Sequence, residues 1–328
     1  MFIAPLAEAP PIGRAPVYII SVFCFTFINF GVVYASNLGM LLSFRFLSGF
    51  IGSPVLATGG SSMADMWSHK KRSYAIGTWG LFAVCGPVLG PLLGGFAAQA
   101  KGWKWPIWEL IWLNAFCFAL LAFCLPETSA ATILFRRARR LRKALGDPTL
   151  MTEAEIEILD IPKSEILKAS LWLPFKLTFR EPILLFTDIY LGLVYAVLYC
   201  WFEAFPLTFI DIHGFNLGTS GLAYLGILIG AIICMALYFT YLYLVQEKQF
   251  ERGTLTPEAR LPPAIVGSIF MPISLFWFGW SARESVHWIV PIIGSGFFSV
   301  GALLLFNAIL NYQGDAYPRY IIPNMASS

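Results

Sequence analysis

Apart from Arg45, residues 15–64 contain no charged side chain. About 20 apolar residues cross a bilayer as one helix, so this run is long enough for two, with turn residues at 36–39 between them. Similar runs recur along the 328-residue chain, and only 12% of its residues are charged, against about 25% in soluble domains. The sequence therefore predicts an integral membrane protein and excludes a soluble enzyme or a nucleic-acid-binding module.

Eight apolar segments follow one another along the chain, each long enough for one membrane-spanning helix. We expect an all-α integral membrane protein, a bundle of about eight transmembrane helices in two groups of four. The groups are an N-terminal half over 1–126 and a C-terminal half over 182–328, joined by a polar central loop over 127–181. The predicted spans are 16–35, 40–62, 73–98, 106–125, 183–210, 217–244, 262–281 and 287–310.

The basic residues lie mainly on one side of this arrangement. Cytosolic segments of membrane proteins carry the excess of Lys and Arg, and the central loop alone has six basic residues in the eight positions 136–143. The basic residues on the opposite side are Lys101, Lys104 and Arg283. We therefore predict that both termini and the central loop face the cytosol. Residues 1–16 lack the basic start of a signal peptide, so we expect no cleavage there.

The third predicted span, 73–98, is rich in glycine and proline. Gly77 is followed, after eight residues, by the run Gly86-Pro87-Val88-Leu89-Gly90-Pro91-Leu92-Leu93-Gly94-Gly95. In a membrane bundle such residues allow close backbone approach and a bend, because neighbouring helices satisfy the freed backbone groups. One interpretation is a packing face of small residues alone. The other is a conformational motif, and its members are Gly77, Gly86, Gly90, Pro91, Gly94 and Gly95.

The pattern G-x8-G-x3-G-P-x2-G-G is complete in this span and is similar to the antiporter motif of proton-driven drug exporters in the major facilitator superfamily. Arg45 to Gly49 resembles the R-x-x-x-G signature of that family's fourth helix. Gly13-Arg14 with Tyr18 resembles the end of the loop signature before its third helix. Further segments resemble the fungal twelve-helix drug:proton antiporters of that family, namely 126–128 with the arginine-rich run, 201–206, 215–218, 257–263 and 314–318.

This resemblance implies a helical bundle of the major facilitator type, in which two halves rock about a site near the midplane. It implies export of small amphipathic organic compounds, such as drugs, toxins, secondary metabolites or polyamines, in exchange for inward-moving protons. The implied partners are the small-molecule substrate, protons and the lipid bilayer, and no nucleic acid. The implied location is the plasma membrane, with the vacuolar membrane as the alternative.

Aligned by these motifs, the eight predicted helices correspond to the third through tenth of the family's twelve. Each half then has four helices where alternating access uses six, so we expect the 328-residue form to insert into a membrane but to transport poorly. The alternative function is therefore a transport-inactive or regulatory fragment of such a transporter. A membrane-embedded enzyme is a third class, but no DxxD or HxxxxD sequence stands at a helix end, so we predict no enzyme.

Three polar residues inside predicted spans are candidates for the substrate or proton pathway, because such residues are costly in lipid and usually face a cavity or a partner. For Arg45, the resemblance implies a proton-transfer or cavity role, and the alternative is a structural arginine bonded to backbone carbonyls. Glu203 is either a proton-binding carboxylate, its pKa raised by the aromatic residues beside it in the sequence, or a glutamate that reaches interfacial water. Asn307, one turn before Asn311, either contacts substrate or bonds to another helix. Asp188 is interpreted as a solvated or helix-start carboxylate.

The sequence gives no indication of a cofactor or a metal. The six cysteines lie in apolar runs without CxxC or histidine-paired spacing, so we interpret them as small buried hydrophobic residues. His213 and His287 lack metal-ligand spacing, and no GxxxxGK[ST] sequence is present. We therefore expect no catalytic residue, no metal and no cofactor, and we expect an ion gradient to drive transport.

Overall fold

The computed structural model describes residues 7, 10–147, 149–153, 155–156, 172, 176 and 178–316. In these residues every regular element is a helix, and eight helical segments are long and apolar enough to cross a membrane. The prediction of an all-helical chain with eight spans is confirmed. The acidic residues Glu157, Asp160 and Glu165 of the central loop, and Arg319 near the C-terminus, lie outside the described residues.

By their internal contacts, the described residues form two compact units, one from Met1–Ser68 and Ile107–Arg180, the other from His69–Pro106 and Glu181–Pro318. We call them the first and the second unit. The glycine-rich third span precedes the central loop in the sequence, yet it belongs to the second unit. The division of the sequence at 126 and 181 stays a prediction.

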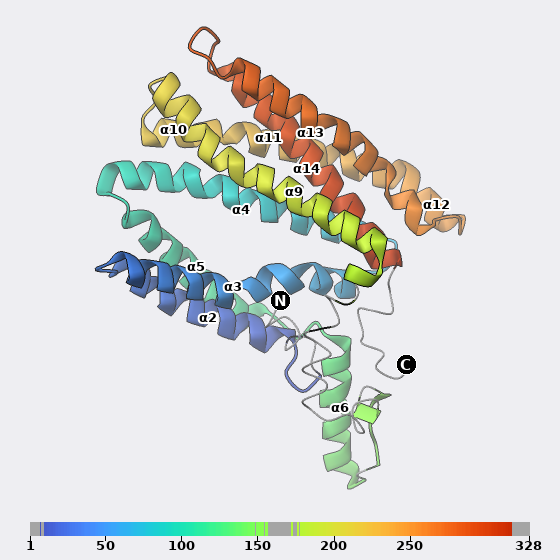
Figure 1. Cartoon of the computed structure of the whole chain (residues 1–328). Helices are drawn as coiled ribbons and strands as arrows, with labels where there is room; N and C mark the ends of the chain where they lie inside the picture. The colour runs from blue at the N-terminus through green and yellow to red at the C-terminus, as the bar shows by residue number, and fades with distance from the viewer. Residues whose placement is uncertain are drawn as a thin grey trace. The chain divides into compact units, whose positions relative to one another are not determined.

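The first unit contains the helices α2 (Arg14–Val33), α3 (Leu38–Met66), α5 (Trp105–Cys124) and α6 (Ala130–Leu145). Helices α2 and α3 pack side by side (Figure 1). Asn37 begins α3 by accepting a hydrogen bond from the Met40 backbone N–H at 2.7 Å. The central loop, predicted only as a polar stretch, contains α6, which Ser129 caps at its start and Gly146 ends in the left-handed conformation (φ 68°).

The second unit is built around α4, α11 and α14, with α13 packed along α14 (Figure 1). Three of its spans are composite, because short α-, π- or 3-10-helical segments follow one another without a long loop. Its elements are α4 (Arg72–Lys101), α9 (Pro182–Pro206), η1 (Leu207–Ile212), α10 (Leu217–Ala223), α11 (Leu225–Tyr241), η2 (Leu242–Gln246), α12 (Glu247–Glu251), η3 (Pro257–Arg260), α13 (Pro262–Ser281) and α14 (Ile289–Ala316).

Two predicted helix ends in the second unit are too early. The span predicted to end at 244 continues through η2 and α12 to Glu251, and the span predicted to end at 310 continues to Ala316. In both cases the added turns carry polar residues that hydropathy excludes from a span. These residues are satisfied by partners on other elements, including Lys71 for Glu247 and Arg260 for Asp315, so the helices extend beyond the apolar stretch.

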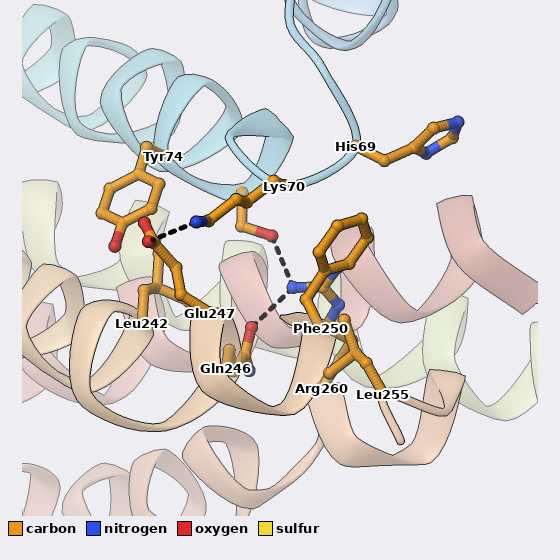
Figure 2. A pocket seen from close by; sticks show the side chains of 10 residues that line it. His69, Lys70, Tyr74, Leu242, Gln246, Glu247, Phe250, Leu255 and Arg260 are labelled. Carbon is orange, nitrogen blue, oxygen red and sulfur yellow. Dashed lines mark hydrogen bonds and ion pairs between the residues drawn. The ribbon is translucent and has the colours of Figure 1, made fainter. Parts of the chain in front are cut away.

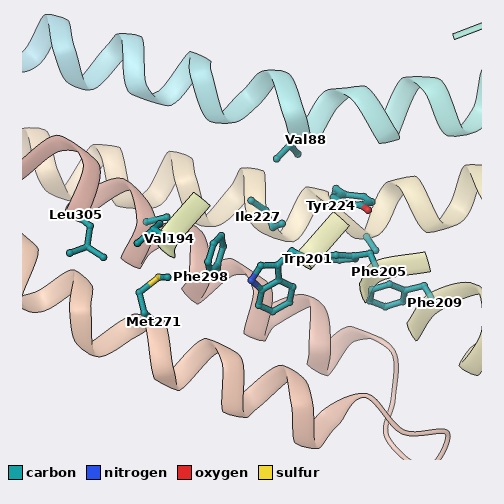
Figure 3. Close-up of a cluster of buried hydrophobic side chains, with 12 residues drawn as sticks. Val88, Val194, Trp201, Phe205, Phe209, Tyr224, Ile227, Met271, Phe298 and Leu305 are labelled. Carbon is teal, nitrogen blue, oxygen red and sulfur yellow. The ribbon is translucent and has the colours of Figure 1, made fainter. Parts of the chain in front are cut away.

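Aromatic side chains form the main core of the second unit (Figure 3). The rings of Phe205 and Tyr224 stack with centroids 4.4 Å apart, which joins α9 to the start of α11. Trp201 meets Phe278 of α13 edge-on at 4.4 Å and also lies 5.5 Å from Phe298 of α14. Such pairs contribute about 0.5–1.5 kcal/mol each beyond the area that they bury. This cluster holds α9, α11, α13 and α14 in fixed positions beside α4.

Candidate functional site

The C-terminal half of α4 packs against α10 through glycines on both helices. A β-carbon placed on Gly95 would lie 2.7 Å from the Leu217 carbonyl oxygen, and one on Gly221 would lie 2.6 Å from that of Pro91. Both neighbours are backbone atoms, which cannot rotate away as a side chain can. The Gly218 N–H also donates to the side-chain oxygen of Gln99 at 2.8 Å. At this end the glycines allow two backbones to touch.

The N-terminal half of α4 packs on α11 and α14, again at a glycine. A β-carbon on Gly77 would lie 2.9 Å from the Met235 methyl group and 3.0 Å from the Phe239 ring. One on Gly80 would lie 3.6 Å from Oδ1 of Asn307. Asn307 is therefore held against the small residues of α4.

The middle of the glycine motif has no such contact. Gly86 and Gly90 are exposed, and within the part of the chain that the structure describes a β-carbon on either would have no neighbour within 4 Å. Gly94 is intermediate, with the Pro106 side chain 3.4 Å from a β-carbon placed on it. Packing thus accounts for Gly77 and Gly95, whereas the packing within the structure does not explain Gly86 and Gly90.

A chain of buried hydrogen bonds joins the N-terminal end of α4 to the C-terminal end of α14. Asn311 donates to the Asn307 backbone oxygen at 2.7 Å and accepts from the Ser73 hydroxyl at 2.9 Å. Ser73 in turn accepts from Nη1 of Arg260 at 2.8 Å. Each buried polar group thereby has a partner, which is the condition for a polar network to stabilise an apolar bundle.

Arg260 is the centre of this network. The residue is only 6% exposed, and it donates from Nη1 to Oε1 of Gln246 at 2.6 Å and from Nε to Oδ2 of Asp315 at 2.9 Å. With Ser73, these contacts connect α4, η2, η3 and α14 at one end of the unit. A buried guanidinium can be tolerated because its planar fork of donors matches several acceptors at once.

Two lysines before α4 lie beside the buried carboxylate of Glu247, and Figure 2 shows one of them, Lys70. Nζ of Lys71 lies 2.6 Å from Oε1 of Glu247, and Nζ of Lys70 lies 3.4 Å from Oε2 and 2.6 Å from Oε1 of Glu251. The hydrogen bond to Glu251 is the main reason that the pKa of Lys70 is raised above its usual value. Lys70 and Glu247 line a small pocket together with Tyr74, Gln246 and Arg260.

The first unit has its own buried arginine at the start of α2. Arg14 is 2% exposed, and its Nη1 lies 2.6 Å from Oδ2 of Asp65 near the end of α3. The Arg14 backbone N–H donates to Oε1 of Glu127 at 3.0 Å. One turn along, the Tyr18 hydroxyl bonds to those of Ser62 and Thr58 at 2.7 and 2.8 Å. An arginine–aspartate pair therefore ties helix ends together in each unit.

The structure does not bring the three predicted pathway residues together in one unit. Arg45 is exposed on α3 in the first unit, and Glu203 is exposed on α9 in the second. Asn307 is 2% exposed and bonds to the Leu303 carbonyl at 2.9 Å and to the Met235 sulfur at 3.8 Å. These contacts fit the interhelical alternative for Asn307.

The aromatic residues next to Glu203 in the sequence do not enclose its carboxylate. Trp201 and Phe205 point into the core on another face of α9, because residues two apart lie about 200° apart around a helix. Glu203 itself is exposed on the surface of α9. Asp188, by contrast, accepts a hydrogen bond from Gln313 at 3.1 Å.

Sequence reasoning missed the two arginine networks. The sequence places Arg14 in a family signature and predicts no partner for Arg260 or Glu247. One sequence feature does indicate such networks: isolated charged residues of both signs lie at the ends of apolar spans. Burying a charge there costs less free energy when it forms an ion pair. The partners themselves lie far apart in the sequence. Within the described ranges, no three His, Cys, Asp or Glu side chains are placed to hold a metal ion.

Comparison with known proteins gives a family model, the Major Facilitator Superfamily, that matches residues 1–324. The transporter mfs1 of Schizosaccharomyces pombe is 44% identical over 98% of this chain and 61% of its own length. The multidrug transporter FLR1 of Candida glabrata is 40% identical over 97% of the chain and 57% of its own length. The fluconazole resistance protein 1 of Saccharomyces cerevisiae is 39% identical over 97% and 58%.

The chain thus spans about three-fifths of the length of the relatives it matches, while the family model covers nearly all of it. The match includes the glycine-rich helix α4, both arginine networks and all eight apolar segments. These observations agree with the all-helical bundle and with the resemblance noted in the sequence. The chain belongs to the Major Facilitator Superfamily and is a multi-pass membrane protein.

Proposed function

We propose that this chain forms the central part of a proton-coupled exporter of small amphipathic organic compounds in the fungal plasma membrane. The observation that carries the proposal is the complete glycine–proline motif of α4. Two of its glycines, Gly86 and Gly90, remain exposed and uncontacted in the described structure although others are filled by neighbouring helices. No packing contact in this state requires Gly86 and Gly90 to be small. Their small size is therefore suited to a close helix contact that forms in another state of the transport cycle.

The names of the relatives support export as the direction of transport. One relative is called a multidrug transporter, and others are called fluconazole and cycloheximide resistance proteins. Fluconazole and cycloheximide therefore serve as probe compounds for this chain. No residue that the structure describes identifies one substrate, so we propose a class of compounds.

In this proposal the exposed charges serve the pathway and the buried ones hold each unit together. Arg45 and Glu203 are the candidates for proton or substrate contact, because each reaches the surface of its own unit from within an apolar span. Asn307 has a positioning role, since its amide is already used between α14 and α11. Protons and the substrate are then the only partners that the transport step requires besides the lipid bilayer.

The test is drug resistance in a yeast strain that lacks its own exporters. The strain expresses either this chain alone or this chain joined to the flanking segments of the transporter mfs1. We expect the joined protein to give resistance to fluconazole or cycloheximide that a protonophore abolishes. From the family's use of six helices per half, we expect the chain alone to reach the membrane and to export poorly.

The control is the joined protein carrying Gly90→Leu, which puts a large side chain at an exposed glycine of the motif. If the joined protein is inserted at the normal level and yet gives no resistance or dye export, the proposed function is wrong. If export persists when the proton gradient is removed, the proton-coupled mechanism is wrong.

A further inference from the structure

The helix α6 of the central loop separates basic and apolar side chains onto opposite faces. About 3.6 residues make one helical turn, so positions 136, 139, 140 and 143 share a face. The residues of this basic face are Arg136, Arg139, Arg140 and Lys143. The opposite face carries the exposed apolar residues Leu134, Leu141 and Leu145.

The first turn of α6 is fixed to the start of α2. The Thr132 methyl group would lie 2.8 Å from a β-carbon on Gly13, and Nη2 of Arg136 donates to the Ile12 carbonyl at 3.2 Å. Both side chains belong to the basic side of α6. Because α2 begins its span at Arg14, the basic side of α6 is turned toward the level at which the chain enters the membrane.

The helix also has the direction of a surface element. In Figure 1, α6 lies beyond the ends of α2 and α3, and its axis makes a steep angle with theirs. Its 16 residues make a cylinder about 24 Å long. A helix that begins beside the start of a span and runs at a steep angle to it has the direction of a helix that lies along the membrane surface.

Part of the positive charge on this helix is neutralised within the protein. Arg142, which flanks the basic face, pairs with Glu155, and Arg136 lies 3.6 Å from Glu127. Arg139, Arg140 and Lys143 are exposed and form no ion pair with any residue that the structure describes. Three cations of the basic face thus remain for a partner outside the described residues.

We propose that the basic face of α6 binds the anionic headgroups of the cytosolic leaflet in which the protein itself sits. The argument is charge complementarity at the correct level: this leaflet is negatively charged, and basic segments near its surface are attracted within a Debye length. The occupant is membrane lipid with a phosphate or carboxylate headgroup, not a soluble anion. The contact fixes the central loop against the membrane.

The experiment uses the 328-residue chain with its cysteines replaced and one fluorophore attached at Ala144→Cys. The protein is placed in nanodiscs of phosphatidylcholine alone or with phosphatidylserine, each with an acceptor dye on a headgroup. We expect energy transfer to be higher with phosphatidylserine and to fall with added salt. Three cations near such a surface strengthen binding by about a hundredfold at low salt.

The variant Arg139→Gln/Arg140→Gln/Lys143→Gln should lose the difference between the two lipids. The matched control, Lys101→Gln/Lys104→Gln/Arg283→Gln, removes three charges predicted on the opposite side and should keep it. The salt dependence is measured on the parent protein, so it does not depend on how the variant folds. Equal transfer in both lipids for the parent protein overturns the proposal.

Two further results would assign the face to another occupant. If transfer rises only after Glu155→Gln, the acidic part of the central loop occupies the basic face and the proposal is wrong. If inorganic phosphate at millimolar concentration abolishes the transfer as completely as removal of phosphatidylserine does, a soluble anion is the ligand and the proposal is again wrong.

Discussion

Nε of Arg260 lies 2.9 Å from Oδ2 of Asp315, so a residue at the start of one span is tied to a residue at the end of another. Arg14 and Asp65 form the corresponding pair in the first unit at 2.6 Å. In both pairs the guanidinium is almost fully buried, whereas the aspartate is partly exposed. Each unit therefore has an arginine–aspartate ion pair that joins helix ends outside the apolar core.

Removing the Arg260 charge should destabilise the second unit strongly. Arg260→Gln leaves Asp315 and Ser73 without their donor, and breaking a buried ion pair costs about 3–5 kcal/mol. Ser73→Ala removes one hydrogen bond and should cost about 1 kcal/mol. Thermal unfolding of detergent-solubilised protein, followed by fluorescence-detected size exclusion, measures both. A smaller loss of stability for Arg260→Gln than for Ser73→Ala would contradict this account of the network.

The glycines of α4 should divide into two classes by their response to alanine. Gly95→Ala forces a β-carbon against the Leu217 carbonyl and should cost about 1–3 kcal/mol. Gly90→Ala meets no described atom within 4 Å and should gain up to about 1 kcal/mol of helix propensity. The same thermal assay compares them. Equal destabilisation by both would show that the exposed glycine is a packing residue.

Glu203→Gln should reduce proton-coupled export more than Asp188→Asn in the protein joined to a relative's flanking segments. Asp188 is already engaged by Gln313, whereas Glu203 reaches the surface of α9. If this carboxylate carries the coupled proton, its neutralisation should lower the efflux rate about tenfold. This corresponds to an activation free energy higher by about 1.4 kcal/mol. Initial efflux rates between about pH 5 and pH 7 test this. Unchanged efflux by the Glu203 variant would remove the residue from the mechanism.

The segment after α6 should loosen in acid but not near neutral pH. The Thr149 hydroxyl and N–H lower the pKa of Asp147. Burial alone would raise the pKa of Glu155, but hydrogen bonds from Thr152 and Arg142 outweigh it and lower the pKa. A carboxyl whose pKa is lower in the folded state stabilises that state at pH values above its unfolded-state pKa of about 4. This stability is lost as the pH falls through the folded-state pKa. Limited acid proteolysis at 146–156 should therefore be constant from about pH 5 to 8 and rise below about pH 4.

The termini and the central loop should face the cytosol. The excess of Lys and Arg on that side is the reason, and the run 136–143 is its largest part. A single cysteine at Lys143 in a cysteine-free protein should be protected from an impermeant reagent in intact cells and become labelled after permeabilisation. A cysteine at Lys101 is the matched control and should react in intact cells. External labelling at position 143 would reverse the orientation.

Hydropathy alone located the eight spans, because the cost of placing charge in lipid is a local property of each segment. The same local reasoning placed two helix ends too early, at 244 and 310, since it cannot detect that Glu247 and Asp315 have distant partners. It also left the central loop as a polar stretch. The helix α6 became visible only when its capping by Ser129 and its contacts with residues 12 and 13 were known.

The family was readable from the sequence because the α4 motif is a contiguous pattern of small residues. Which of those glycines touch a neighbour was not readable, since it depends on α10, α11 and α14, more than 100 residues later in the chain. The same holds for Asn307 and Arg260, whose partners come from several elements. Hydrophobicity and residue size are properties of each residue and can be read from the sequence. Hydrogen-bond and ion-pair partners depend on which elements the tertiary fold brings together.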